Sequence, residues 1–416
     1  MNRDHIAGFL SKSLSFSIFF TLFSFISLVG AETDVKELAS SASNKDDTEL
    51  DLMIDDLLGP DPRQIELECI GLQPKDPGKS VSHFLDVAAK LGYRNNLLSS
   101  SLLIEEDSFV KTSLDFYLTT ANPSKNEVVF YLFAEQSHFL TVQTDGDEQY
   151  LTTRLQLKRK PNSVFHYGIR TDYVQQTYLD STTAVVNQSI PVLHNTDGSV
   201  TPFAQIWIGS TMSASLEITA SENTMSETDE DYRGSRISAG YTYYYGSQSQ
   251  LKAAIEVMSN SYDNFKTRNL EGQPVYGTVL QTQISQVKLQ QNHHSVRFSS
   301  FIFATEILGT QKTDNGAGYY NYFGQQAAET VKYTSGKWEA HLAARLSHYA
   351  YEKRLVTGTA EETLAIVRQS LTGSATGKIS TTFLVNVEFR YTNSIANDEV
   401  ETFASSSLII GVTARF

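Results

Sequence analysis

Residues 381–392 read TTFLVNVEFRYT, and this stretch decides the fold class. Successive side chains of an extended chain point to opposite faces. The stretch therefore has one apolar face and one polar face, formed by Phe383, Val385, Val387, Phe389 and Tyr391 and by Asn386, Glu388 and Arg390. Such a strand fits a wall that has water on one side and an apolar medium on the other.

The same alternation, rich in Tyr, Phe, Val, Ile and Thr, runs from about residue 83 to the end of the chain. It predicts sixteen strands, at residues 86–97, 108–119, 126–142, 148–159, 163–178, 200–209, 212–222, 232–244, 249–262, 277–290, 294–308, 317–334, 337–354, 361–371, 378–392 and 402–416. Short and long connections tend to alternate between them. Leu179–Ser199, Asn223–Asp231 and Asp263–Tyr276 are long, whereas Gln291–His293 and Thr372–Gly377 are short.

This arrangement is typical of a closed barrel in a membrane. A closed antiparallel sheet has no unpaired edge, so it can sit in lipid. Bacterial barrels of this kind have even strand numbers, short periplasmic turns and longer outer loops. The sequence predicts an all-β fold: a transmembrane antiparallel up-and-down β-barrel of about sixteen strands with an extended acidic N-terminal leader. Barrels of this size usually leave an aqueous channel. A soluble β-sandwich would need neither the alternating connections nor an export signal.

Residues 1–31 have the features of a signal peptide. Arg3 and Lys12 give a basic start, a charge-free apolar run follows, and Val29-Gly30-Ala31 offers small residues before a cleavage point. The alternative is an uncleaved anchor helix, but the apolar run is shorter than the ~20 residues that a membrane helix needs.

Residues 32–82 form the predicted leader on the periplasmic side. They hold 13 acids and five bases, and four prolines crowd residues 60–77. One short helix is expected within them, because Leu50, Met53, Ile54, Leu57 and Leu58 make a single apolar stripe. It is either a weakly ordered helix in a tail, or a docking helix for a periplasmic partner, or a plug in the barrel. Residues 83–416 are then the barrel.

Composition argues against several classes of protein. The 47 acids and 33 bases leave a net charge of −14, which argues against a nucleic-acid partner. The single cysteine, Cys69, can build neither a disulfide framework nor a multi-cysteine zinc site. The chain has no HExxH or GxSxG motif. We therefore expect no enzyme, no catalytic residue, no metal and no cofactor.

Three local patterns could suggest chemistry. Residues 371–378 resemble a phosphate-binding loop, but the spacing is one residue short and Ile379 replaces the hydroxyl residue, so a glycine-rich turn is favoured. His293 and His294 are adjacent on a strand and would point to opposite faces, which forms no chelate. Glu339, His341 and Arg345 share a face, and solvated lumen residues explain them better than a hydrolase site does.

The polar strand faces predict the pore lining. Its residues are expected to include Lys111, Arg154, Lys158, Arg170, Arg236, Arg345, Glu388 and Arg390. With Lys252, Arg297 and Arg415 the inward bases number ten, against six inward acids: Asp115, Asp172, Glu217, Glu256, Glu339 and Glu388. Two interpretations stay open. The mixed charges brace and hydrate the wall, or the excess of bases gives the pore a mild preference for anions.

The last strand has an apolar face that ends at the terminal residue: Leu408, Ile410, Val412, Ala414 and Phe416. This pattern is similar to the C-terminal signal by which the barrel assembly machinery recognises outer-membrane barrels. Glu388–Thr392, Asn397-Asp398 and Gly411–Phe416 resemble the ends of β-barrel porins of the porin-2 type. Gly92–Asn96 resembles its first strand, although that family more often has an acid where Arg94 stands. The resemblance covers about residues 86–416 and implies a porin-like channel, but it names no solute.

Two function classes follow for a protein of the bacterial outer membrane. The first is a passive or weakly selective channel for small hydrophilic solutes. The second is a barrel of a secretion or surface-polymer export system, which would contact a periplasmic protein through residues 32–82. The expected partners are outer-membrane lipid, the barrel assembly machinery, small solutes and, in the second case, that periplasmic protein. Deleting residues 32–82 would leave a simple pore conducting but would cost an assembly component its partner.

Overall fold

The structure is a computed structural model that describes residues 81–96, 105–122, 126–142, 146–179, 192–226, 230–245, 249–294, 300–356, 359 and 361–416. The predicted signal peptide and all of the predicted leader up to residue 80 lie outside these residues, so both stay predictions. Within the described part of the chain, no helix is long and apolar enough to cross a membrane.

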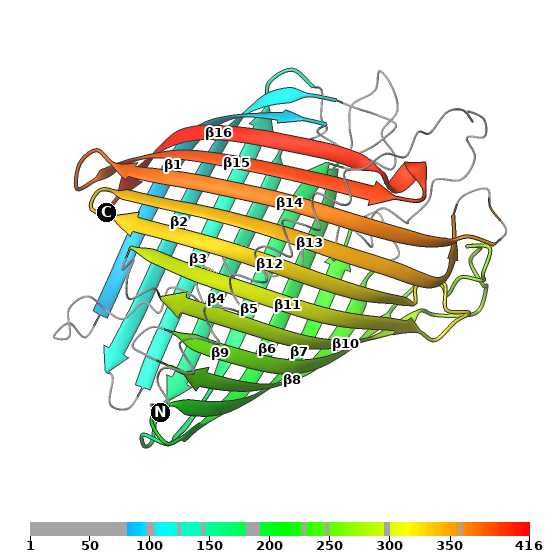
Figure 1. The fold of residues 1–416 in the computed structure, drawn as a ribbon, viewed down its shortest axis with the longest axis horizontal. Helices are drawn as coiled ribbons and strands as arrows, with labels where there is room; N and C mark the ends of the chain where they lie inside the picture. The colour runs from blue at the N-terminus through cyan, green and yellow to red at the C-terminus, as the bar shows by residue number, and fades with distance from the viewer. Residues whose placement is uncertain are drawn as a thin grey trace, which may run out of the picture. The chain divides into compact units, whose positions relative to one another are not determined.

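Sixteen antiparallel strands form one closed barrel (Figure 1). Their bounds are β1 Val81–Asn95, β2 Asp107–Asn122, β3 Asn126–Phe139, β4 Glu148–Arg159, β5 Phe165–Leu179, β6 Val192–Ile208, β7 Met212–Met225, β8 Tyr232–Tyr244, β9 Gln250–Tyr262, β10 Gln281–His294, β11 Phe301–Asp314, β12 Tyr322–Ser335, β13 Trp338–Leu355, β14 Thr363–Lys378, β15 Phe383–Ala396 and β16 Phe403–Arg415, with a short 3-10 helix, η1, at Glu399–Glu401. Each strand pairs with its sequence neighbours, and β1 pairs with β16. The predicted fold class is confirmed.

Backbone hydrogen bonds close the barrel at its two ends in sequence. In the register of β1 with β16, Val87 lies opposite Ala414 and Tyr93 opposite Leu408. Beyond the last strand residue, the Phe416 amide donates to the Leu85 carbonyl at 2.9 Å, and the Leu85 amide donates back to Phe416 at 3.2 Å. The terminal residue is therefore part of the seam.

The connections differ in length at the two ends of the barrel. One end, the short-turn end, carries 123–125, 160–164, 209–211, 245–249, 295–300, 336–337 and 379–382. The other, the long-loop end, carries 96–106, 140–147, 180–191, 226–231, 263–280, 315–321, 356–362 and 397–402. β1 begins and β16 ends at the short-turn end. The predicted trend therefore holds once the strand bounds are corrected.

Several expected connections lie within strands. Residues 192–199, expected in a long loop, belong to β6, and the expected turn Gln291–His293 lies within β10. The glycine-rich stretch 371–378 is not a turn, because it pairs with β13 and β15 along its whole length. Glycine is useful there for packing: a Cβ on Gly377 would stand 2.6 Å from the Trp338 ring. Residues 277–280, expected in a strand, end the loop 263–280.

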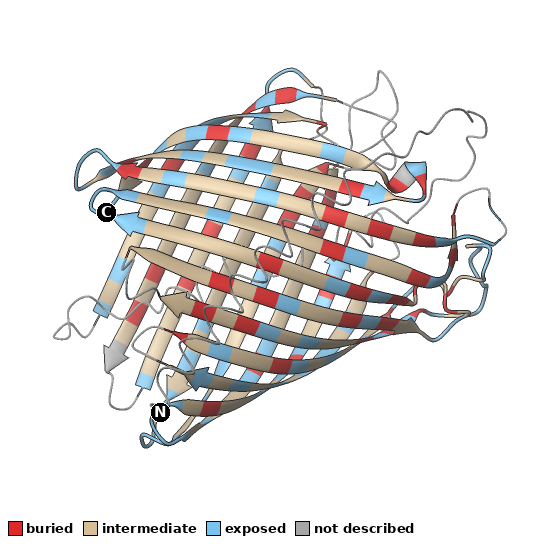
Figure 2. Cartoon of the chain, viewed as in Figure 1, coloured by how far each residue is buried: buried red, intermediate tan, exposed pale blue. Residues whose placement is uncertain are grey.

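Side chains alternate across the wall of the barrel, as Figure 2 shows by their burial. The outward positions carry the exposed apolar residues, among them Leu155, Ile169, Leu216, Ile237, Ile255, Val287, Phe389 and Ile410. The inward positions carry the charges described below. Hence the wall has an apolar outside and a polar inside, which is the inverse of a soluble barrel.

A rim of packed side chains ties the loops of the long-loop end together. Phe265 and Tyr320 pack with Tyr262 and Leu280 in one buried cluster. The guanidinium of Arg354 lies 5.8 Å from the Tyr319 ring centre and 5.2 Å from that of Tyr351. It also donates to Glu401 of η1 at 2.7 Å, and both side chains are nearly buried, at 9% and 8% exposure. This pair joins the end of β13 to the loop before β16.

Candidate functional site: the charged lumen wall

All eight predicted pore-lining residues lie on described strands at inward positions. The strict alternation explains this, since each lies between neighbours that face outward. Ile169 and Ile237, which flank Arg170 and Arg236, are 41% and 55% exposed on the outer wall.

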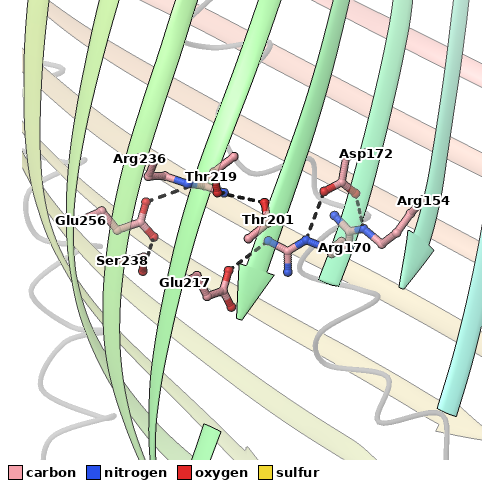
Figure 3. Close-up of polar contacts among 9 residues, drawn as sticks. All are labelled: Arg154, Arg170, Asp172, Thr201, Glu217, Thr219, Arg236, Ser238 and Glu256. Atoms are coloured by element: carbon pink, nitrogen blue, oxygen red, sulfur yellow. Dashed lines mark hydrogen bonds and ion pairs between the residues drawn. The ribbon is translucent and has the colours of Figure 1, made fainter. Parts of the chain in front are cut away.

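The largest group of lumen charges is a ladder across β4 to β9 (Figure 3). Arg154 donates to Asp172 at 2.5 Å, and Arg170 contacts Asp172 at 3.1 Å and Glu217 at 3.0 Å. Arg170 thus lies between two carboxylates from different strands. In this part of the wall bases and acids alternate, so the ladder nearly neutralises itself.

The ladder continues through hydroxyl groups. The Thr201 and Thr219 hydroxyls lie 2.9 Å apart, and Arg236 donates to Thr219 at 3.3 Å. Arg236 also faces Glu256 at 3.8 Å, and Ser238 donates to the same carboxylate at 3.4 Å. The contacts follow the register, because Thr219 lies opposite Arg236 in the pairing of β7 with β8. These two runs of contacts, one from Arg154 to Glu217 and one from Thr201 to Ser238, together cover six strands.

A second group lies across the seam, on β15 and on β1 to β4. Lys90 pairs with Glu388 at 2.5 Å and Lys111 with Glu135 at 2.7 Å. Arg94 makes two hydrogen bonds to Glu148, at 3.0 and 3.1 Å. Lys111 also lies within electrostatic range of two further bases, Arg390 and Arg94. Here bases are neighbours of bases, in contrast to the alternation of the ladder.

Two predicted pore-lining residues, Arg345 and Lys158, lie outside these two groups. Arg345 on β13 makes no hydrogen bond or ion pair with any residue in the described ranges. It lies opposite Ala328 and Ser370 on the adjacent strands, so its neighbours are neutral. Lys158, near the short-turn end, interacts with Glu127 and with Lys160. Arg345 is thus an inward base whose opposite neighbours on both adjacent strands carry no charge.

Sequence reasoning missed part of the lining. The missed inward bases include Lys90, Arg94, Lys288 and Lys332, and the missed acids include Asp86, Glu127, Glu135, Glu148, Asp197 and Glu306. Many of them lie on strands whose inward face is itself partly aromatic, as with Tyr131 and Phe133 beside Glu135. Continuing the strict alternation through those strands would have found them. Arg297, also expected inside, lies outside the described residues.

The contacts of the residues that could suggest a hydrolase or metal site do not support such a site. Glu339 pairs with Lys332 at 2.7 Å, as a lumen ion pair. His293 stacks on Tyr245 with ring centres 6.3 Å apart. Among the described residues, no group of three or more His, Cys, Asp or Glu could hold a metal ion. Cys69 lies outside the described residues.

The expected assembly residues share the outward face of β16. Leu408, Ile410 and Val412 are 47%, 52% and 47% exposed, and Phe416 is 69% exposed at the short-turn end. Ala414 lies on the same face, between Val87 and Phe383. The face is therefore apolar and open along its length, as recognition before insertion would require. That recognition stays a prediction.

No family model matches the chain, and no curated protein matches its sequence. Among solved structures, the chain is similar to OccAB1 of Acinetobacter baumannii, with 9% identity, 83% of this chain and 99% of that chain covered, and a TM-score of 0.45. It is also similar to an anion-selective porin from Comamonas acidovorans, with 10% identity, 81% and 99% covered, and a TM-score of 0.43. A third is a loop-deletion form of OmpT, an outer membrane protein of Vibrio cholerae, with 10% identity, 81% and 99% covered, and a TM-score of 0.39.

Proposed function

We propose that the chain is a porin-like channel of the bacterial outer membrane that passes small hydrophilic solutes. The observation that carries the proposal is the inverted wall: a closed sixteen-strand barrel with exposed Leu, Ile, Val and aromatic side chains outside and ionised side chains inside. An apolar outer band suits lipid, and inward charges suit water. Channel passage needs no catalytic residue, metal or cofactor. Outer-membrane lipid and the barrel assembly machinery are its proposed partners, and membership of the porin-2 type is part of the same proposal.

Topology gives the first test of this location. A tag inserted after Tyr276, in the loop 263–280, should be labelled by antibody on intact cells, because the long-loop end faces outward in such barrels. The Tyr276 side chain is 85% exposed, so an insertion there disturbs little packing. The matched control is a tag at Ser210, in the turn between β6 and β7, which should be labelled only after permeabilisation. The reverse pattern would place the barrel upside down.

The lumen charges support a weak preference for anions. In the ladder, each base has an acid beside it, and such pairs brace the wall. Arg345 differs, because the residues opposite it are neutral, and Lys111, although it pairs with Glu135, also lies within electrostatic range of the bases Arg390 and Arg94. Bases that lack a nearby acid along a pore favour anions, but the missed lumen residues, six acids and four bases, make the excess of bases smaller than the sequence predicts. Salt screens such charges over roughly 8 Å at physiological ionic strength, so the preference should fade as salt rises.

Reversing the charge of two of these bases tests the proposed preference for anions. Arg345→Glu combined with Arg390→Glu should move the reversal potential of the reconstituted channel, under a KCl gradient, toward that of a cation-selective pore. The matched control is Arg233→Glu, since Arg233 is an exposed outward residue near the long-loop end whose pair with Glu222 is solvated. It should leave the reversal potential nearly unchanged. A double variant with unaltered selectivity would show that these side chains do not line the conducting path.

A further inference from the structure

One buried cluster of aromatic side chains faces the lumen in the half of the barrel nearest the short turns. Tyr117 on β2 and Tyr131 and Phe133 on β3 are 9%, 8% and 7% exposed, and Phe84 and Val129 pack against them. Tyr117 lies directly opposite Tyr131 in the pairing of β2 with β3. The Tyr117 ring stacks on the Phe84 ring with centres 5.6 Å apart. These five residues form what we call the inner aromatic cluster.

Its position sets the inner aromatic cluster apart from the other buried apolar clusters of the described chain. The other four lie at the long-loop end, where strand ends and loops pack on one another, as Phe265 and Tyr320 do. The inner aromatic cluster instead begins at Phe84, three residues after the first residue of β1 at the short-turn end. Rings beside a water-filled channel are unfavourable unless an apolar group covers them.

The loops and turns of the barrel are too short or too distant to provide this cover. Tyr117 lies ten residues along β2 from the long-loop end, about 33 Å at the rise of a strand. The connection 96–106 beside it must leave and return within eleven residues, so it reaches back at most about 19 Å. The longest connection, 263–280, is tied to the rim of the long-loop end. The short turns 123–125 and 160–164 have only three and five residues.

The opposite wall of the barrel is also out of reach. Sixteen strands spaced ~4.8 Å apart have a combined width of about 77 Å, which closes into a cylinder about 24 Å across. Barrels of this size usually leave an aqueous channel rather than a core filled by side chains. The cover must therefore come from a segment that enters the lumen.

The predicted leader joins the barrel next to the cluster. Residue 80 precedes Val81, the first residue of β1, and Phe84 lies three residues further on. The 22 residues 59–80 span up to about 68 Å as an extended polyproline helix, so they allow the segment before them to reach any part of the inner half of the lumen. That segment carries the apolar stripe predicted from the sequence, formed by Leu50, Met53, Ile54, Leu57 and Leu58.

We propose that the apolar stripe of the leader packs on the inner aromatic cluster, so that residues 50–58 line the pore from inside as a short helix. The inference deepens the proposed function and rests on it, because it assumes a water-filled pore. The dimensions agree. Nine helical residues extend ~13 Å, and Phe84 and Phe133, two strand spacings and two residues apart, are separated by about 12 Å.

The helix would narrow the pore and change its charge. With the stripe against the wall, Asp51, Asp55 and Asp56 lie on the opposite side of the helix and face the water of the pore. Acids along a pore favour cations, so these three oppose the preference for anions that inward bases give. The width and the selectivity of the channel are then set in part by its own leader.

Disulfide cross-linking tests the contact in the full chain. In a Cys69→Ser background, Met53→Cys with Val129→Cys should form an intrachain disulfide on mild oxidation in outer membranes. The disulfide is read as protection of both thiols from a maleimide polymer added after denaturation. The matched control is Met53→Cys with Thr330→Cys, since Thr330 shares the inward face of β12 with Ala328, on the other side of the closed sheet. This pair should keep both thiols free.

Three outcomes of the cross-linking would overturn the proposal. Equal protection of the two pairs would show that the leader has no fixed place in the lumen. Protection of neither pair would show that the stripe does not lie on the cluster. A link from Met53→Cys to a different protein would make the leader a docking segment for a periplasmic partner.

Conductance of the reconstituted barrel tests the effect on the pore. Leu50→Ser, Ile54→Ser and Leu57→Ser together should raise the single-channel conductance by about half or more, because a helix about 10 Å across leaves the lumen. The reversal potential should move toward that of an anion-selective pore. Leu50→Met, Ile54→Leu and Leu57→Met together keep the stripe apolar and should conduct like the wild type.

A triple serine variant with the conductance and selectivity of the wild type would overturn the proposal. Failure of the channel function itself is distinguishable. A folded barrel in which neither the wild type nor the serine variant conducts counts against that function, whereas the cross-link still reports whether the leader lies on the cluster.

Discussion

Gly168→Val should abolish recovery of the folded barrel. Gly168 faces the lumen on β5, and a Cβ there would stand 2.1 Å from the Leu157 carbonyl oxygen and 2.6 Å from the Phe203 ring. The Leu157 carbonyl cannot move easily, because it belongs to the backbone of β4, which pairs with β5. The Phe203 ring is also held in place, because Phe203 lies on β6 directly opposite Gly168. Protein interiors of this density do not absorb such an overlap.

The folded fraction can be measured by the heat-dependent shift in gel mobility that folded outer-membrane barrels show. The matched control is Gly309→Val on β11, where an added Cβ meets nothing within 4 Å. It should fold almost as well as the wild type, although both changes replace a strand glycine by the same side chain. Normal recovery of folded Gly168→Val would show that the Phe203 ring does not pack closely against Gly168 of β5.

Arg354→Met should destabilise the rim of the long-loop end by roughly 3–5 kcal/mol, as the loss of one member of a buried ion pair does. The change leaves the Glu401 carboxylate, 8% exposed, without the guanidinium that lies 2.7 Å from it. It also removes the cation from between the Tyr319 and Tyr351 rings. The loop 397–402 should then be cut faster by a protease added to intact liposomes, and the urea midpoint should fall.

Arg233→Met is the control for this change. Arg233 and Glu222 form an ion pair at 3.4 Å with side chains 70% and 68% exposed, and solvated pairs of this kind contribute between zero and about 1 kcal/mol. Neither the cleavage rate nor the urea midpoint should change appreciably. If Arg354→Met behaves like Arg233→Met, the buried pair does not hold the rim together.

The number of strands could be predicted from the sequence because lipid and water impose the period on every strand. Where the two faces differ most, the bounds are accurate, as in β4 at Glu148–Arg159 and β8 at Tyr232–Tyr244. The bounds failed where local residue types compete with pairing. Gly373 and Gly377 favour a turn in isolation, yet pairing on both sides keeps them in β14. Val279 lies in the expected strand 277–290, yet it belongs to a loop held by Phe265 and Leu280.

The same alternation of apolar and polar residues allowed part of the pore lining to be predicted. Arg154, Arg170 and Arg236 each stand next in sequence to an apolar residue that faces outward, so alternation assigns the arginines to the lumen. Their partners could not be predicted, because an ion pair such as that of Lys90 with Glu388 depends on the register of two strands that lie far apart in sequence.

The seam between Leu85 and Phe416 has a consequence for biogenesis. The two strands that must pair to complete the cylinder are the first and the last to be made, so the most sequence-distant contact in the described chain is also the one that removes both open edges. Contacts of this kind form slowly because a long loop must close first. Until β16 pairs with β1, a sheet built from the other strands exposes two edges that can pair with other chains. We therefore expect the unfolded chain to need protection from such pairing until both strands are available, and a form that lacks one of them to keep open edges.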